Sequence, residues 1–157
     1  MTISNLAPIL REHAFFEGLQ PDYIELLIEC ASNVCFNAGE FIFRQGDEAN
    51  RFYLIRHGKV AVEISAPGQR TIAIETLTDN DVLGWSWLFP PYQWLFDARS
   101  LELTRAIALD GRCLRGKCDS DPALGYELMK RFSFIMLESL RATQIQLLDL
   151  YGLPNRR

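Results

Sequence analysis

The chain has 157 residues, of which 48% are hydrophobic and 23% charged, a balance that suits one folded domain and excludes an intrinsically disordered chain. Its 16 lysine and arginine residues against 20 acidic ones give a net charge of −4, so the basic surplus typical of a direct DNA-binding protein is missing. No apolar run approaches the roughly 20 residues of a membrane span and the N-terminus lacks a signal-peptide pattern, so we expect a cytoplasmic protein without membrane contacts.

The first 33 residues are expected to form a helical entrance to a single domain that spans the whole chain, residues 1–157. Leu6, Ile9 and Leu10 have the spacing of one or two helical turns. A better helix is predicted from Pro21 onward, because proline suits the first helical position and an acid follows it. Between these two segments, residues 15–19 read as an apolar turn packed on the core.

Residues 34–110 are predicted to be strands. Apolar residues alternate with the period of two that half-buried strands need in Val34-x-Phe36, Phe41-x-Phe43, Phe52-x-Leu54, Val60-x-Val62-x-Ile64 and Ile72-x-Ile74. Glycines and the segment 79–81 separate these runs as turns, and residues 106–109 form the last predicted strand. Many short antiparallel strands at this spacing predict a sandwich or barrel.

Residues 111–152 are predicted to be helical. Asp121 is an N-cap, Pro122 occupies the first helical position, and Gly152 with Pro154 ends the helix. The result is a helix of roughly 30 residues and about 45 Å.

This helix carries two apolar stripes. One consists of Leu124, Leu128, Phe132, Met136, Leu140, Thr143, Leu147 and Leu150. The other consists of Phe134, Leu137, Ile145 and Leu148, interrupted by Arg141. A surface helix needs one apolar face for its own domain, so the second stripe predicts a homodimer through this helix. The alternatives are that both stripes are buried within the chain, or that the helix docks on a separate protein partner.

Four cysteines, Cys30, Cys35, Cys113 and Cys118, lack the paired CxxC spacing of a zinc or redox site. We expect four reduced thiols in a cytoplasmic protein, with an iron–sulfur site or a disulfide switch as the alternative. No metal and no cofactor are predicted.

The segment 38–60 resembles the cyclic-nucleotide-binding domain family, the sensor domain of Crp-Fnr-like regulators. Gly39, Gly46 and Gly58 fall at the family's turn positions, and residues 52–55 form the four-residue apolar strand before the last of them. The likeness extends to the entrance segment, to Leu83-Gly84 at the start of the phosphate-binding cassette, and to the long closing helix. It implies an antiparallel double-stranded β-roll, jelly-roll-like, with N-terminal helices and a long C-terminal helix.

The cassette departs from the family's pattern. In the family a glutamate directly after the glycine binds the ribose and a later arginine neutralises the cyclic phosphate, as an anion site requires. Here Trp85 follows Gly84, and alignment on Ala98 leaves Phe96 in the arginine's place, with Asp97 beside it and Arg99 nearby. Ordinary cyclic AMP binding is therefore not expected.

Two interpretations of the cassette remain. The rings form walls for an unidentified nucleotide-like ligand, or they fill the old pocket and the roll has become a scaffold. The residues predicted to bind such a ligand are Gly84, Trp85, Ser86, Trp87, Asp97, Ala98, Arg99 and Ser139. Ser139 and Leu140 align with the family's base-contacting positions on the long helix.

We predict a non-catalytic, stand-alone regulatory sensor. A cupin-like enzyme would need clustered histidines, and the chain has only His13 and His57. Related transcription regulators carry a helix-turn-helix domain after the long helix; if this chain is complete, it has no such domain and does not read DNA in that way.

Overall fold

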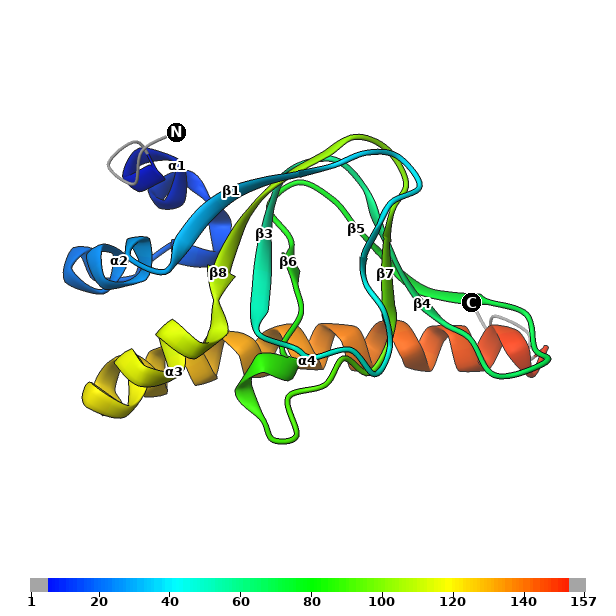
Figure 1. Ribbon diagram of the computed structural model, residues 1–157. Coiled ribbons are helices and arrows are strands. Elements are labelled where there is room, and N and C mark those ends of the chain that lie inside the picture. The colour runs from blue at the N-terminus through cyan, green and yellow to red at the C-terminus, as the bar shows by residue number, and fades with distance from the viewer. Residues whose placement is uncertain (1–5, 153–157) are drawn as a thin grey trace, which may run out of the picture.

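The structure is a computed structural model that describes residues 6–152 (Figure 1). Its elements in chain order are α1 (Leu6–Glu12), η2 (Ala14–Phe16), α2 (Pro21–Ile28), β1 (Ala31–Phe36), β2 (Phe41–Phe43), β3 (Arg51–His57), β4 (Val60–Ile64), β5 (Ile72–Leu77), β6 (Val82–Leu83), η3 (Ser86–Leu88), β7 (Asp97–Ser100), β8 (Thr104–Asp110), α3 (Gly111–Ser120) and α4 (Pro122–Leu150). The predicted roll, with helices before it and a long helix after it, is confirmed. No helix among the described residues is long and apolar enough to cross a membrane.

The roll consists of two antiparallel four-stranded sheets in the described part of the chain, β1-β8-β3-β6 and β2-β7-β4-β5. Helices α1, α2 and α3 gather at one end, and α4 runs along one side of the roll (Figure 1). Strands β6 and β7 were not predicted, because β6 has two residues and β7 alternates polar side chains with one alanine. Strand β1 begins at Ala31, three residues before the predicted start.

The core has two parts on opposite faces of β3. Phe52 and Leu54 belong to a cluster shared with the helices, whereas Tyr53 and Ile55 belong to a cluster inside the roll. Because strand side chains alternate between faces, a strand covered on both sides is apolar throughout. This explains why residues 52–55 form a continuous apolar run.

Helix α4 begins and ends where the sequence predicts. The Asp121 side chain accepts a hydrogen bond from the Leu124 N–H (3.3 Å), and Pro122 occupies the first turn. Gly152 has φ +62° just past the helix, a conformation that suits a glycine at the C-terminal end of a helix. Pro154 lies outside the described residues.

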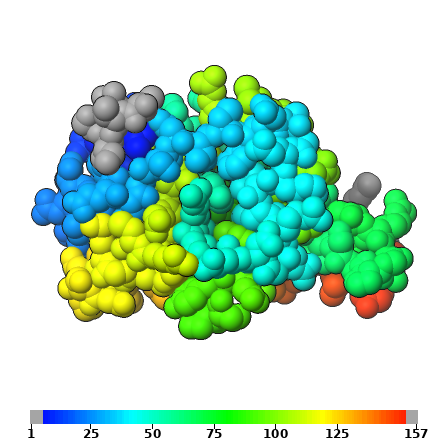
Figure 2. All heavy atoms as spheres, in the orientation of Figure 1, coloured from blue at the N-terminus to red at the C-terminus, as the bar shows by residue number. Residues whose placement is uncertain are grey.

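Only the first half of α4 is buried against its own domain. Leu124, Leu128 and Phe132 are buried. The apolar side chains exposed along the helix are Met129, Phe134, Leu137, Leu140, Ile145, Leu147, Leu148 and Leu150. The last turns of α4 and the tip of the β4–β5 hairpin project together from one side of the molecule (Figure 2). The second stripe and the C-terminal half of the first are therefore not buried within the described chain.

In this structure Cys30 and Cys113 form a disulfide with Cα atoms 5.8 Å apart, contrary to the expectation of four reduced thiols. Their proximity follows from strand pairing: Ala31 lies opposite Leu109, and the Asp110 N–H donates to the Cys30 carbonyl (2.9 Å). Cys35 is exposed and Cys118 half-buried, both unpaired.

Candidate functional site

Gly84 opens the cassette in a conformation that only glycine accepts easily. Its φ is +97°, and a Cβ placed there would lie 2.7 Å from two ring atoms of Trp94. A side chain at this position would be strained and would collide with that indole. The glycine thus lets Trp94 lie directly against the turn.

Aromatic side chains fill the interior of the roll. The Trp94 ring stacks on Phe43 with centroids 3.7 Å apart and planes 6° apart. Phe96 lies 5.8 Å from Phe43 and 5.4 Å from Trp85, centroid to centroid. Trp94 and Phe96 are 4% and 6% exposed, so the space next to Gly84 is packed by the chain itself.

Trp87 and Ser86 lie in η3, and Trp87 faces the other part of the core. Its ring packs on Phe52 and Phe132, at centroid distances of 5.3 and 5.4 Å. The predicted site residues of this segment are therefore divided, with Trp85 and Gly84 by the roll interior and Trp87 under the helices. Two buried polar atoms, Ser86 Oγ and Trp87 Nε1, have no hydrogen-bond partner among the described residues.

Asp97 and Arg99 do not join Gly84. Ala98 is fully buried inside the roll, and because strand side chains alternate, its neighbours face outward. There Arg99 binds both carboxylate oxygens of Glu63 at 2.9 and 3.1 Å. Asp97 accepts from the Gln45 N–H (2.7 Å). The interpretation of Arg99 and Asp97 as contacts of a ligand inside the roll is not supported by this arrangement.

Ser139 lies on α4 and contacts β5 instead of the cassette. Its hydroxyl donates to Glu75 Oε1 at 2.8 Å. Burial raises the pKa of Glu75 above its ordinary value, the Ser139 hydrogen bond opposes this, and nearby Asp81 and Glu138 raise it further. Leu140, the adjacent predicted position, is 54% exposed.

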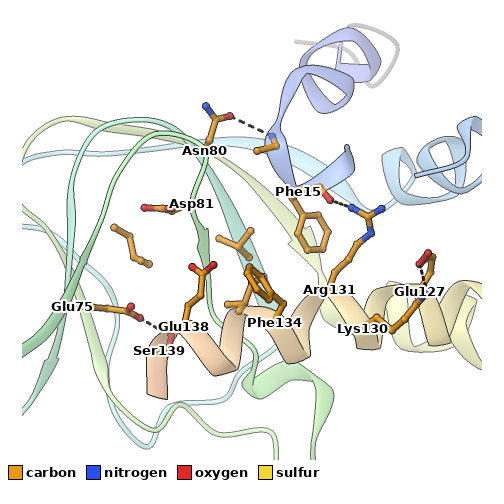
Figure 3. A pocket seen from close by; sticks show the side chains of 14 residues that line it. Phe15, Glu75, Asn80, Asp81, Glu127, Lys130, Arg131, Phe134, Glu138 and Ser139 are labelled. Atoms are coloured by element: carbon orange, nitrogen blue, oxygen red, sulfur yellow. Dashed lines mark hydrogen bonds and ion pairs between the residues drawn. The ribbon is translucent and has the colours of Figure 1, made fainter. Parts of the chain in front are cut away.

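Ser139 also borders a groove of about 520 Å³ between the roll, η2 and α4. In Figure 3, Glu138 and Phe134 extend from α4, Asp81 and Asn80 lie on the turn before β6, and Phe15 lies at the η2 end. We call this the α4 groove. It lies apart from the aromatic cluster that fills the roll.

Comparison with known proteins identifies the fold's relatives. Residues 33–121 match the profile of the cyclic nucleotide-binding domain. The chain belongs to the cyclic nucleotide-binding domain family. A CRP-like cAMP-activated global transcriptional regulator of Mycobacterium tuberculosis is 28% identical over 142 residues, which are 90% of this chain and 62% of the regulator. The chain thus spans about three-fifths of that relative's length.

Solved structures of other proteins have the same fold. A candidate cyclic nucleotide-binding protein of Geobacter metallireducens superposes with a TM-score of 0.76 at 25% identity, covering 85% of this chain and 97% of that one. The sensor domain of the transcriptional regulator DNR of Pseudomonas aeruginosa gives 0.70 at 17% identity, covering 88% and 93%.

Within the family, this cassette lacks the glutamate and the arginine of the family's pattern. Phe96, in the arginine's place, is buried among rings, and Trp85, in the glutamate's place, contacts Phe96. A buried phosphate needs hydrogen-bond donors or a cation, and the nearest predicted cation, Arg99, is paired with Glu63 on the outer face. Space and charge both argue against the family's usual anion here.

The acids of the α4 groove, Glu75, Asp81 and Glu138, were missed by the sequence reasoning. Acidic residues are ordinary on exposed strands, turns and helix faces, so nothing in their spacing marks them as neighbours.

Among residues 6–152, no group of three or more histidine, cysteine or acidic side chains is placed to hold a metal. His57 is exposed beside Asp79, and His13 is buried under η2.

Proposed function

We propose that this chain is a non-catalytic regulatory domain whose roll is closed to cyclic nucleotides by its own aromatic side chains. The observation that carries the proposal is the Trp94–Phe43 stack beside Gly84, with Phe96 buried in the arginine's place. A ligand would have to displace two buried rings and place its phosphate against carbon. The rings instead stabilise the roll as a packed scaffold.

Calorimetric and thermal-shift titrations with cyclic AMP and cyclic GMP test this proposal. A ligand at a hundredfold excess over its Kd adds about 2.7 kcal/mol to stability, so binding would be plain in the melting temperature. We expect no heat of binding and no shift. The cAMP-activated regulator of Mycobacterium tuberculosis, measured in parallel, is the positive control. A saturable shift with either nucleotide would contradict the proposal.

The orphaned Ser86 Oγ and Trp87 Nε1 favour a second candidate, a sensor for a small polar ligand at η3. Buried polar atoms without partners cost about 1–3 kcal/mol each and often indicate a missing water or ligand. Screening fractionated metabolite extracts by thermal shift tests this candidate. A shift in melting temperature that disappears in Ser86→Ala supports this candidate. If no fraction shifts the melting temperature, this candidate is rejected and the scaffold function is the one that stands.

We further propose that the domain is a homodimer through α4. Its support is the exposed apolar surface along the C-terminal half of that helix, in particular Leu140, Ile145 and Leu148. Pairing of the same face from two chains would bury these side chains with two-fold symmetry. Light scattering distinguishes this from docking on a separate protein, which predicts a monomer in the purified sample.

A cytoplasmic location is also proposed, on the basis of the regulatory relative. The Cys30–Cys113 disulfide is unusual for a reducing compartment. Acid quenching of cells followed by thiol alkylation reports its state there. Two extra reactive thiols, relative to the purified oxidised protein, are expected if the proposal is right. A fully oxidised pair would contradict it.

A further inference from the structure

The α4 groove has the size of a small-molecule site. Its volume of about 520 Å³ falls within the range of roughly 300–1,000 Å³ that such sites occupy. Its walls combine apolar side chains, including Leu77, Val82 and Ile135, with eight polar or charged residues. Phe134 borders the groove with 59% of its surface exposed, so one aromatic face is available to a ligand.

The charges of the groove are separated along its length. Glu75, Asp81 and Glu138 lie at the Ser139 end, and Lys130 and Arg131 lie at the other end (Figure 3). Within residues 6–152, none of these three carboxylates takes part in an ion pair. The Ser139 end is therefore negative and without a counter-charge from the chain.

The two cations of the groove are already engaged. Lys130 pairs with Glu127 at 3.4 Å. Arg131 donates to the carbonyl oxygens of Phe15 and Glu17, which ties α4 to the entrance. Neither side chain is directed at the three acids, so an anionic ligand at the Ser139 end would meet only like charge.

We infer that the α4 groove binds a small organic cation, an amine or amidine whose apolar body rests on Phe134 and whose charge lies among Glu75, Asp81 and Glu138. The face of the Phe134 ring attracts both a cation and an apolar body. The three carboxylates, which have no cationic partner among residues 6–152, would gain one. Burial is the main cause of the raised pKa of Glu75, and Asp81 and Glu138 raise it further, so a cation bound among these acids would favour its ionised form. This inference does not depend on the state of the roll interior.

Benzamidine is a suitable probe, since benzamide has nearly the same shape without the charge and benzoate has the opposite charge. Calorimetry on the full chain is expected to show saturable benzamidine binding, with benzamide weaker by about tenfold or more, a difference of about 1.4 kcal/mol, and no benzoate binding. Equal affinity for benzamidine and benzamide, or no saturation with benzamidine, would overturn the inference.

Two exposed acids on the same helix provide matched variants. Glu138→Gln is expected to weaken benzamidine binding by about three- to fivefold, the worth of one solvent-accessible ion pair. Asp149→Asn, an exposed acid beyond the groove, should leave affinity unchanged. Equal losses of benzamidine affinity in both variants would show a general charge effect and would contradict the inference. Backbone amide shifts confined to Asn80, Asp81 and Ser139 would place the probe in the groove; shifts elsewhere would not.

A second copy of the chain could cover Phe134, and the same probe detects this. Benzamidine affinity is compared between the parent protein and Ile145→Lys, which lies outside the groove and is designed to be monomeric. Equal affinity supports an open groove. Binding by the monomeric variant alone would show that the face belongs to the dimer and would overturn the inference. The cyclic nucleotide titrations report separately on the roll.

Discussion

In the cassette, the Trp94 ring packs directly against the backbone of Gly84. In Gly84→Ala the new methyl would meet the Trp94 ring at 2.7 Å and hold a φ of +97°, so we expect a loss of about 2–4 kcal/mol in unfolding free energy from strain and overpacking together. Gly39→Ala is the matched control, with φ +85° and nothing within 4 Å; it should cost only about 1–2 kcal/mol. Urea titrations measure both.

A double variant isolates the collision. Trp94→Leu removes the ring and should be destabilising by itself, but Gly84→Ala should cost less in that background than in the parent. Additive losses in the double variant would show that the two residues do not contact each other.

Burial holds His13 in its neutral form, and its hydrogen bonds determine which ring nitrogen carries the proton. Its Nδ1 accepts from the Phe15 N–H (3.2 Å), so Nε2 carries the proton toward the Ile55 carbonyl (3.1 Å). Burial lowers the pKa of His13 from its ordinary 6.5, while the neighbouring Asp81 opposes the shift. As the pH falls, the His13 ring therefore takes up its second proton in the unfolded chain before it does so in the folded chain.

The stabilising effect of neutral His13 is thus complete above pH 6.5 and declines as the pH drops below that value. Unfolding free energies from pH 7.5 to 5.5 should fall by at most about 1.4 kcal/mol per pH unit for this one group, and His13→Gln should remove that slope. The raised pKa of Glu75 acts in the opposite direction but is common to both proteins, so the comparison cancels it. An unchanged slope in the variant would refute the assignment.

At the cassette, the sequence does not reveal the direction of every side chain. Alignment on Ala98 put Phe96 in the arginine's place, and both residues do lie inside the roll. Arg99 was predicted to bind a ligand together with Ala98, but consecutive residues in a strand face opposite sides of the sheet, so Arg99 faces away from the interior of the roll. Its partner Glu63 lies on another strand, and no local pattern reveals such a pairing.

At the scale of elements, the boundaries of α4 could be predicted from residues that cap a helix. Asp121-Pro122 and Gly152 bound α4 because caps act within one turn of the chain. The disulfide could not be predicted in the same way. Cys30 and Cys113 are 83 residues apart in sequence, and they meet only because β1 and β8 pair across the whole roll.

The disulfide joins the end of the entrance to the first turn of α3, so it should contribute substantially to stability. Its removal is expected to cost about 2–5 kcal/mol, because the unfolded chain gains the freedom of a long loop. A phosphine reductant should lower the melting temperature of the parent, and the double variant Cys30→Ser/Cys113→Ser should melt at that lower value with or without reductant. Cys35→Ser, an exposed thiol, is the control and should keep the parent's response. A parent indifferent to reductant would contradict the linkage.

For the whole molecule, the proposed dimer depends on the C-terminal half of α4. Ile145 is 60% exposed on the second stripe, and Ile145→Lys places a charge where a partner helix would pack. We expect light scattering to show a dimer for the parent and a monomer for the variant, with the variant's own folding stability changed by no more than about 0.5 kcal/mol. Gln144→Lys, an exposed neighbour, should remain dimeric. A parent that is monomeric at all concentrations would rule out the dimer.

The concentration of indole rings in one short segment also makes the protein its own optical reporter. All three tryptophans, Trp85, Trp87 and Trp94, lie within ten residues of each other, and they face both halves of the core. Selectively excited emission therefore monitors the cassette alone, whereas far-ultraviolet dichroism is dominated by the helices. If the roll loosens before α4 melts, the two signals will separate, and the first place to give way can be read without attaching a dye.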